Sequence, residues 1–419
     1  MADAVNPNRI GRAFDRAALE RLADWLAVAV VVTLPWSTSI SQILIVAWLV
    51  ALIPTLDVAT VRRELQTAAG ALPALLWLLA LAGVLWANVP WAERIAGLGG
   101  FHKLLIIPLL LAQFRRSERG WFVLYGFLAS CLVLLVASVV VWLLPFHVIG
   151  RQSGVPVRDY IAQSTEFLIC IFALLAYAFD SQRERRRTHA AVAALLALLL
   201  LADILAVATG RTALVVIPLL LLLLGHRLFG LKGVVAACLV GGAIAALAWT
   251  ASPFLRERIH RSMIEVQLYQ TTNELTSTGI RFELWKKAFA FVSAAPVIGH
   301  GTGSIPDQYR RVATGEGVTA IAANNPHNQI LAVAIQLGLL GVAGLMTMWV
   351  AHLALFRGAG LVSWIGLVIV TQNIVSSLFN SHLFDSFHGW LYVFGFGVIG
   401  GMVLREAGWT RTRAKTETP

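Results

Sequence analysis

Long apolar runs alternate with short polar segments along most of this chain, and the charged residues gather in the segments between the runs. A helix of about 20 apolar residues is long enough to cross the hydrocarbon core of a bilayer. The pattern therefore predicts an all-α polytopic membrane protein with about twelve transmembrane helices. We place these spans at 22–36, 39–56, 71–87, 98–114, 121–144, 162–179, 190–208, 211–226, 233–251, 329–351, 360–379 and 388–404.

One long interval, residues 252–328, departs from this pattern because it is mostly polar. Its apolar residues recur at helical spacing around 254–270 and 281–294, which predicts two amphipathic helices at the membrane surface. We therefore expect a large loop that caps the bundle between spans nine and ten. The predicted parts are an N-terminal tail, nine spans, the cap, three spans and a C-terminal tail, at 1–21, 22–251, 252–328, 329–404 and 405–419.

The composition is that of a membrane protein, since 58% of the residues are hydrophobic and only 13% are charged, against about 25% charged in soluble domains. The run after the basic N-terminus leads directly into a second span, so we expect no cleavable signal peptide. Cys131, Cys170 and Cys238 all lie inside apolar runs. We expect them to be packed side chains, with neither a disulfide nor a metal site.

The formal net charge of +11 comes from basic residues concentrated in alternate loops. In a soluble protein this charge could suggest nucleic acid, but in a membrane protein it records orientation and contact with anionic lipids. We therefore expect no nucleic-acid partner, cytoplasmic termini and an extracytoplasmic cap. The basic residues of the predicted cytoplasmic loops are Arg62, Arg63, Arg115, Arg116, Arg119, Arg183, Arg185, Arg186, Arg187, Arg227, Lys232 and Arg357.

Residues 190–224 are almost continuously apolar, and as one helix they would be roughly 52 Å long, too long for a core of about 30 Å. Basic clusters flank this run on both sides, which puts both of its ends inside. The chain must therefore turn at its only clear breaker, Thr209-Gly210. Arg211 then lies at the outer mouth of a helical hairpin.

Five charged or titratable residues from distant parts of the sequence fall on this outer side. They are Lys103, Arg211, Arg281, His327 and Asp385. Charged groups at membrane depth are costly and usually face a cavity that serves a function. Arg211 begins a helix after a glycine, where free N–H groups and the helix dipole favour an anion, although an arginine there can also simply reach the lipid headgroups.

Arg281 opens an amphipathic segment that also contains Lys286 and Lys287. It could bind a specific anion, or the three cations together could bind lipid phosphates without specificity.

His327 follows Pro326 at a predicted helix start. It could accept a proton near neutral pH, or it could be only a polar residue at a helix cap. Asp385 could be an ordinary loop carboxylate, and Lys103 could pair with Glu93 or bind lipid.

The sequence contains no HExxH, P-loop or GxSxG motif and no close pair of acidic residues, so we expect neither a metal nor a cofactor. Gly299, Gly301 and Gly303 predict a tight turn, because glycines outside a strand–helix context are weak indicators of nucleotide binding. The candidate chemistry is therefore that of an anion site built from arginines.

Three short motifs in this order resemble those of the bacterial O-antigen ligase family, whose superfamily also contains O-antigen polymerases and protein O-oligosaccharyltransferases. The motifs are Thr209-Gly210-Arg211-Thr212, Arg281-xxx-Trp285 in the long loop, and Pro326-His327-Asn328-xx-Leu331. The twelve predicted spans, the inside N-terminus and the large loop agree with this family, so the resemblance covers nearly the whole chain.

The resemblance implies a multi-pass glycosyltransferase of the C type in the bacterial inner membrane, with its active site at the periplasmic face. Such an enzyme would transfer O-antigen from undecaprenyl pyrophosphate to a sugar hydroxyl of lipid A–core oligosaccharide in lipopolysaccharide biosynthesis, by a metal-independent, inverting reaction without a cofactor. The hypothesis gives Arg211 and Arg281 the pyrophosphate and His327 the proton of the attacking hydroxyl. Further substrate contacts are assigned to Lys103, Asp385 and Asn328, with Asp385 also able to orient His327.

Other functions stay open. An O-antigen polymerase or a protein O-oligosaccharyltransferase would share the donor and differ in the acceptor. A transporter or flippase of lipid-linked sugars would instead need charges near the bilayer midplane and broken helices. Asp203 is the only clear acid deep in a predicted span.

Overall fold

The computed structural model describes residues 15–144, 154–208, 210–251, 253–272 and 274–416. Every regular element in these residues is a helix, which confirms the all-α prediction. The elements in chain order are α1 (Arg16–Thr33), α2 (Thr38–Leu52), η2 (Ile53–Thr55), α3 (Val58–Leu65), α4 (Ala68–Gly83), α5 (Trp91–Gly99), η3 (His102–Leu105), α6 (Ile106–Phe114), α7 (Gly120–Leu143), α8 (Tyr160–Arg183), α9 (Arg187–Ala206), α10 (Arg211–Ala251), α11 (Pro253–Thr272), α12 (Ser277–Ala294), α13 (Ile305–Val312), η4 (Gly317–Ala320), α14 (Gln329–Leu355), α15 (Leu361–Ser376) and α16 (Ser386–Thr416).

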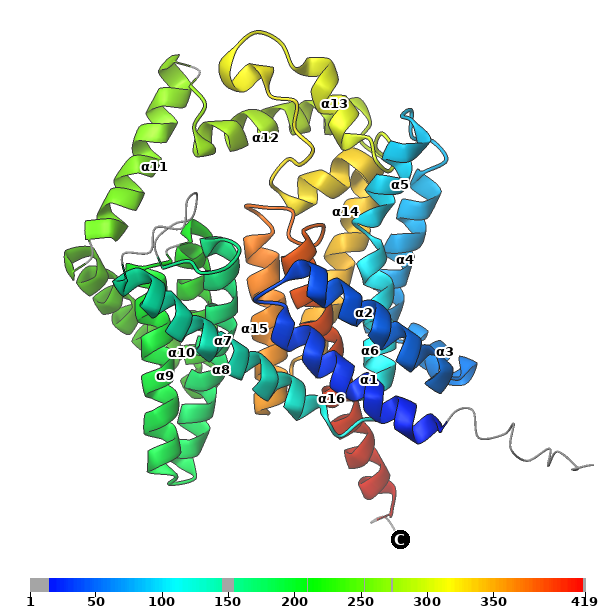
Figure 1. The fold of residues 1–419 in the computed structure, drawn as a ribbon, viewed down its shortest axis with the longest axis vertical. Helices are drawn as coiled ribbons and strands as arrows, with labels where there is room; N and C mark the ends of the chain where they lie inside the picture. Colours follow the sequence, from blue (N-terminus) through cyan, green and yellow to red (C-terminus); the bar gives the residue numbers. More distant parts are fainter. Residues whose placement is uncertain (1–14, 145–153, 209, 252, 273, 417–419) are drawn as a thin grey trace, which may run out of the picture.

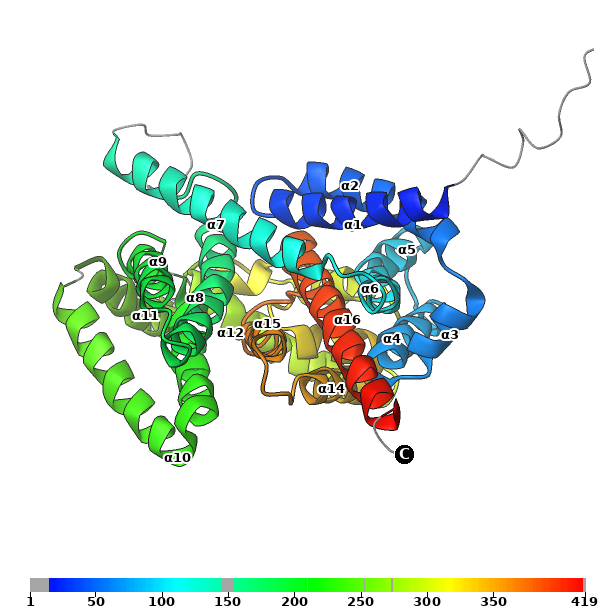
Figure 2. The same cartoon turned by 90° about the horizontal axis from the view of Figure 1, so that it is seen from below.

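The helices form a bundle with a cap at one end. Figures 1 and 2 place α8, α9 and α10 at one side of the bundle and α3 to α6 at the other, with α14, α15 and α16 between them. The helices α11, α12 and α13 lie at the top of Figure 1, while the turn between α8 and α9 and the C-terminus lie at the opposite end. The cap therefore covers one end of the apolar bundle.

The predicted number of membrane spans is supported in part. Each of the twelve predicted stretches lies on a helix, but only seven helices of the described residues are long and apolar enough to cross a membrane, or up to nine spans if each bent pair is one. The bent pairs are α3 with α4, at 89°, and α5 with the segment of η3 and α6, at 46°. The helix α15 is too short to count, at 16 residues. This count takes α10 as one helix although its backbone turns at Gly230, so the total of twelve spans stays a prediction.

The element α10 is a hairpin of two helical arms. Its backbone leaves the helical region at Gly230, where φ is 61° and ψ is −142°, a conformation that glycine adopts without steric cost. The arms lie against each other, since Gly225 meets the backbone of Gly233 and Leu221 lies beside Gly241. The predicted spans 211–226 and 233–251 correspond to these arms, and the turn predicted before Arg211 is confirmed, although Thr209 lies outside the described residues.

The cap contains helices at both predicted positions, α11 and α12, without the marked apolar faces expected of amphipathic helices. It also contains α13 and η4, which the sequence pattern did not predict. The predicted tight turn after α12 is also present, because Gly299, Gly301 and Gly303 have φ values of 67°, 89° and 89°. A Cβ at any of these glycines would clash with neighbouring backbone. These positions therefore need glycine for both conformation and space.

This turn attaches the cap to the bundle through a break in α14 at Gly338, where φ is 60° and ψ is −160°. The N–H of His300 donates to the carbonyl of Ile335 at 2.8 Å, and the N–H of Leu339 donates to the carbonyl of Pro296 at 2.8 Å. The turn thereby forms hydrogen bonds with backbone groups that the break would leave unpaired. Backbone groups inside a membrane need such partners because no water is there to replace them. It also fixes the cap relative to the start of α14, where His327 lies.

Candidate functional site

Three of the predicted residues meet beneath the cap. Arg211 is the first residue of α10, Arg281 lies in the second turn of α12, and His327 precedes α14. The three lie close enough that the positive charge of Arg211 lowers the pKa of Arg281, and the positive charge of Arg281 lowers the pKa of His327. The structure therefore brings together groups that are 116 positions apart in the sequence, as their common outer side predicted.

The Arg211 guanidinium is held by a carboxylate of the cap. Its Nη2 donates to Oε1 of Glu265 at 3.0 Å, and its Nη1 donates to Oε2 of the same side chain at 3.1 Å. Nη1 also donates to Oγ1 of Thr278 at 2.9 Å. Burial opposes ionisation of Glu265, but its bonds with Arg211 and Thr278 outweigh burial and lower its pKa to about 2. The pair is therefore ionised at any physiological pH.

Arg281 contrasts with Arg211 because its guanidinium has no hydrogen bond or ion pair with any of the residues that the structure describes. Burial lowers the pKa of Arg281, and the nearby charge of Arg211 lowers it further, whereas Tyr160 and Glu265 act in the opposite direction. An arginine with an ordinary pKa above 12 stays charged after such a shift. Arg281 thus has a positive charge inside the site without a direct ionic partner among the described residues, although Glu265 lies close enough to act on that charge.

The backbone and side chain of His327 are both fixed. Its φ of 51° lies in the left-handed region, which is uncommon for residues with a side chain. Its N–H donates to Oδ1 of Asn325 at 2.8 Å, and its Nδ1 lies 3.1 Å from Oδ1 of Asn380. An amide oxygen only accepts, so Nδ1 carries the proton and Nε2 has a free lone pair.

The protonation state of His327 follows from the same surroundings. Burial lowers its pKa and the charge of Arg281 lowers it further, although the bond with Asn380 opposes both. The imidazole is therefore neutral near pH 7 and able to accept a proton at Nε2. Asn380, from the segment after α15, was missed because a single asparagine in a polar loop carries no distinctive sequence signal.

Asn328, a predicted substrate contact, is the N-cap of α14 in the structure. Its Oδ1 accepts from the N–H of Leu331 at 3.0 Å, and its Nδ2 donates to the carbonyl of Leu378 at 3.0 Å. The helix therefore starts at Gln329, where the predicted span 329–351 begins. Both ends of this amide stabilise the fold around His327.

Lys103 and Asp385 lie together, and neither forms a hydrogen bond with Arg211 or Arg281. The Lys103 ammonium donates to the carbonyls of Asp385 at 2.7 Å, Phe384 at 3.1 Å and Leu383 at 3.5 Å. The alternative pairing of Lys103 with Glu93 is wrong, since Glu93 pairs with Arg310 at 2.7 Å. Lys103 therefore fixes the turn before α16.

The Asp385 carboxylate caps α16 and orients a different histidine from the predicted one. Its Oδ1 accepts from the N–H groups of Phe387 and His388, both at 2.8 Å, and from Nδ1 of His388 at 2.9 Å. Burial opposes ionisation, but these bonds outweigh it and lower the pKa of Asp385. The expectation that Asp385 orients His327 is thus replaced by the pair of Asp385 and His388.

His382 and His388, which had no predicted role, form a buried pair with ring centroids 3.9 Å apart. The His382 nitrogens and Nε2 of His388 have no hydrogen-bond partner among the described residues. Burial and the charges of His388 and Arg281 lower the pKa of His382. His388 of this pair lines a small cavity with both polar and apolar walls, whose polar residues include Thr165, Asn373 and Ser376.

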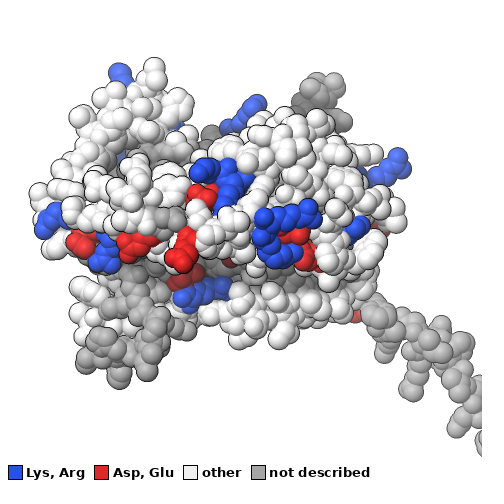
Figure 3. Space-filling model, turned by 90° about the horizontal axis from the view of Figure 1, so that it is seen from above, with Lys and Arg blue, Asp and Glu red and all other residues white. Residues whose placement is uncertain are grey.

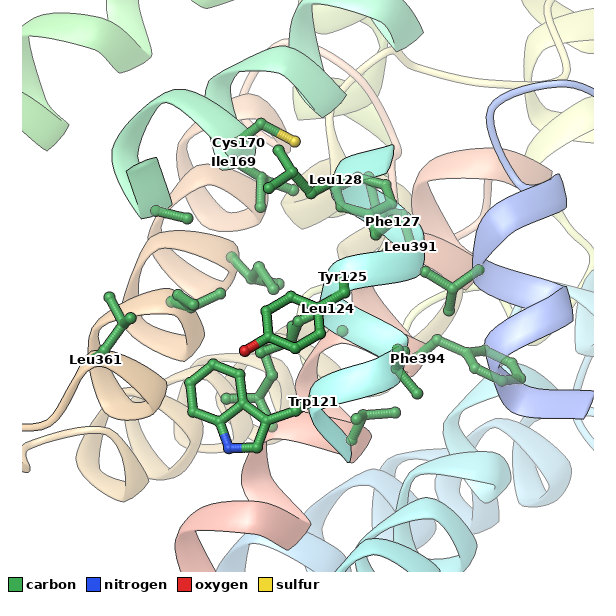
Figure 4. Close-up of a pocket in the computed structure, with 18 of the residues that line it drawn as sticks. Trp121, Leu124, Tyr125, Phe127, Leu128, Ile169, Cys170, Leu361, Leu391 and Phe394 are labelled. Carbon is green, nitrogen blue, oxygen red and sulfur yellow. The ribbon is translucent and has the colours of Figure 1, made fainter. Parts of the chain in front are cut away.

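An apolar groove of about 340 Å³ runs between α7, α8, α15 and α16 and reaches toward this small cavity. Figure 4 shows Trp121 and Tyr125 of α7 on one side of the groove and Leu361 of α15 on the other. The groove and the small cavity share Ile169, Ile369 and Leu391. The residues that line the groove are mostly apolar, as in surfaces that contact hydrocarbon chains. The groove lies within the helix bundle, next to the small cavity.

The outer face of the cap end carries charges of both signs close together (Figure 3). Arg310 pairs with Glu93 and Arg311 pairs with Asp307, each at 2.7 Å. The two arginines are about half exposed, and ion pairs near the surface contribute little to stability. Each of these arginines has a carboxylate partner, whereas Arg281 has none in direct contact among the described residues.

The comparisons with known proteins agree with the motifs. A family model described as O-Antigen ligase matches residues 196–346, a segment that contains Arg211, Arg281 and His327 and omits Lys103 and Asp385. No curated protein sequence matches the chain. The chain is therefore similar to the O-antigen ligase family over residues 196–346, and the resemblance inferred from its motifs is confirmed.

Proposed function

We propose that this protein is an O-antigen ligase, which transfers O-antigen polysaccharide from undecaprenyl pyrophosphate to a sugar hydroxyl of lipid A–core oligosaccharide. The observation that carries the proposal is the unpaired guanidinium of Arg281 close to both Arg211 and His327. The match to the family model over this segment supports it. The groove between α7 and α15 gives an isoprenoid or acyl chain an apolar surface on the bundle side.

In this mechanism the arginines stabilise the leaving group. The bond between the anomeric carbon and the pyrophosphate oxygen breaks, and its electron pair stays on that oxygen. Arg281 and Arg211 bind the departing charge, since guanidinium groups match phosphate oxygens in bidentate geometry. Preorganised cations in a site sheltered from water stabilise developing charge without reorganisation at the moment of reaction.

His327 is the proton acceptor in the same step. The acceptor hydroxyl attacks the anomeric carbon from the face opposite the pyrophosphate, which inverts the configuration. Its proton passes to Nε2 of His327, which is free because Asn380 holds Nδ1. Asn380 is a positioning residue here, because it acts on the reaction only through the imidazole.

We further propose that the cap faces the periplasm and that both termini lie in the cytoplasm of a bacterial inner membrane. The basic residues of the predicted cytoplasmic loops support this orientation. The turn between α8 and α9, which contains Arg185 and Arg186, lies at the end opposite the cap (Figure 1). Cysteine labelling from outside the cell at an introduced cap cysteine would test this orientation.

The function is tested with purified protein, lipid-linked O-antigen and lipid A–core, separated on a gel after incubation. A ladder of lipid A–core that carries long glycan is the expected result. Elongated lipid-linked glycan with unchanged core would instead identify an O-antigen polymerase, which shares the donor. Transfer to a protein acceptor in the same assay would identify a protein O-oligosaccharyltransferase.

A transporter or flippase is the second candidate class, and the break in α14 is the observation that would favour it. The turn from residue 296 to residue 301 fills this break with backbone hydrogen bonds. Transporter breaks instead leave backbone groups free for a substrate or ion. If both substrates stayed chemically unchanged while labelled lipid-linked glycan crossed proteoliposomes, the ligase proposal would be wrong.

A further inference from the structure

Glu265 of α11 forms an ion pair with Arg211 at 3.0 Å, and no motif of the sequence indicated it. We propose that Glu265 is a positioning residue, which holds one edge of the Arg211 guanidinium so that the other edge faces the pyrophosphate. The inference rests on the proposed function, because it gives Arg211 its role in binding the leaving group.

The carboxylate of Glu265 is almost fully engaged. Its Oε1 accepts from Nη2 of Arg211 at 3.0 Å. Its Oε2 accepts from Nη1 of Arg211 at 3.1 Å, from Oγ of Ser277 at 3.2 Å, and from both the N–H and the Oγ1 of Thr278, at 3.2 Å and 2.5 Å. Displacing a carboxylate with this many charge-assisted or neutral bonds costs several of them at once. A bound pyrophosphate would therefore add to this arrangement and not replace it.

The bonds of Arg211 are concentrated on one edge. Nη1 donates to Glu265, Ser277 and Thr278, and Nη2 donates to Glu265 alone. Nε has no partner among the described residues. A guanidinium carries five N–H donors in a planar arrangement, and its Nε and Nη2 donors together form a second fork. Nε is buried, so this second fork is an unsatisfied donor pair inside the site, which a phosphate oxygen would satisfy.

The same carboxylate sets the spacing of the two arginines. By accepting from the N–H of Thr278 it fixes the first turn of α12, and Arg281 lies three residues further along that helix. Glu265 therefore connects Arg211 at the start of α10 to Arg281 in the cap. Both cations are aligned on the departing pyrophosphate in the transition state only while this connection holds.

The charge of Glu265 makes the role testable. With Glu265 in place, Arg211 and Glu265 form a neutral pair, and Arg281 supplies the net positive charge. Replacing Glu265 with glutamine or alanine removes a negative charge beside the anion, which should leave donor binding unchanged or tighter. It also frees Arg211 from its orientation, and misplacement of about 1 Å can cost as much as 10²-fold in rate.

The experiment measures kcat, the KM for lipid-linked glycan, and thermal stability in Glu265→Gln and Glu265→Ala. We expect kcat to fall about 10- to 100-fold, with a KM no higher than that of the wild type and little change in Tm. Glu257→Gln is the matched control, because Glu257 lies on the same helix, is 60% exposed and pairs only with Arg261 among the described residues. This control should behave as the wild type.

A double variant separates positioning from an independent role. If Glu265 acts through Arg211, then Arg211→Ala with Glu265→Ala loses no more kcat than Arg211→Ala alone, since coupled residues are non-additive. Additive losses, wild-type kinetics in Glu265→Gln, or a kcat above that of the wild type would each overturn the inference. A wild-type protein that transfers glycan to neither core nor lipid-linked glycan would overturn the proposed function instead. Binding of undecaprenyl pyrophosphate still tests the inference in that case, because a tenfold loss of binding in Glu265→Gln contradicts it.

Discussion

Two polar clusters lie at the cap end of this protein, and they use similar residues in opposite ways. The arginine cluster consists of Arg211, Glu265, Arg281 and His327, and the lysine cluster consists of Lys103, Asp385, His382 and His388. In the lysine cluster the charged groups are hydrogen-bonded to the backbone, since Lys103 donates to three carbonyls and Asp385 accepts from two N–H groups. In the arginine cluster, Arg281 and Nε2 of His327 stay available.

The comparison teaches that the partner of a charge decides what the charge can do. A buried cation with its hydrogen bonds satisfied stabilises a turn, and removing it leaves unpaired carbonyls. A cation held in place without a partner is ready to bind an anion from outside. The two clusters therefore make opposite predictions for activity and for stability.

Arg281→Ala should have the largest effect on activity and reduce glycan transfer to background at normal protein levels. The variant removes the guanidinium of the cluster that has no direct ionic partner among the described residues, and no neighbouring described residue can replace it. Arg281→Lys should restore little, because the bidentate fork is lost. The gel assay for glycan on lipid A–core measures both variants.

The matched control for Arg281 is Lys286→Ala, an exposed cation on the same helix. If the cap cations only bound lipid phosphates without specificity, the two variants would lose similar activity. Equal losses would thus assign Arg281 to the lipid surface and remove it from the mechanism.

His327→Ala should reduce kcat by about 10²–10⁴-fold, the range for loss of a general base. The arginines and the cap stay in place in this variant, so the KM for the donor should change little. Steady-state kinetics with a defined acceptor measure both constants. A loss below about tenfold would restrict His327 to positioning the acceptor.

The pH dependence of transfer should follow the neutral form of His327. Burial and Arg281 lower its pKa from the ordinary value of 6.5, so the base form persists below that pH and is lost only as the pH falls through the lowered pKa. The acid limb of kcat/KM should therefore have its midpoint below 6.5. The residual activity of His327→Ala should lack this limb, and a midpoint above 6.5 would contradict the assignment.

Lys103→Met should affect stability more than activity. Lys103 is 7% exposed, and its removal leaves the carbonyls of the turn before α16 without their donor. Unsatisfied buried groups cost about 1–3 kcal/mol each, so Tm in detergent should drop by several degrees, while the folded fraction keeps most of its kcat. Lys232→Met, at an exposed lysine, is the control. Loss of glycan transfer at unchanged Tm would instead indicate that Lys103 contacts the substrate.

The sequence predicted the residues of the arginine cluster better than those of the lysine cluster. Arg211, Arg281 and His327 lie in short motifs at helix starts, and hydropathy alone put them on one side of the membrane. Asp385 was expected to orient His327, but Asn380 does so, because the turn before α16 directs Asp385 onto His388. Such pairings depend on loop conformation, which periodicity does not encode.

The fold was predictable to a similar extent. The apolar runs identified helices, but the break at Gly338 depends on close backbone contacts with Val297 and Ile298, and the bend at Gly230 depends on the close approach of Gly225 and Gly233 across the hairpin. The described helices give seven to nine candidate spans when α10 is counted once, so the total of twelve stays a prediction. Glu265 was missed for a related reason, since only the folding of α11 over α10 brings its carboxylate to Arg211.

Removing divalent metals should have the smallest effect on the arginine cluster. In the proposed mechanism the guanidinium groups of Arg281 and Arg211 carry the charge of the leaving pyrophosphate, so excess chelator should leave kcat unchanged. The measurement is the rate of transfer before and after chelation, with Arg281→Ala as a reference for the loss of one cation. A rate that collapses with chelator and returns only with a divalent ion would mean that a metal shares this charge. In that case the guanidinium groups of the arginine cluster would not account for the leaving charge by themselves, and the contrast between the two clusters would no longer explain catalysis.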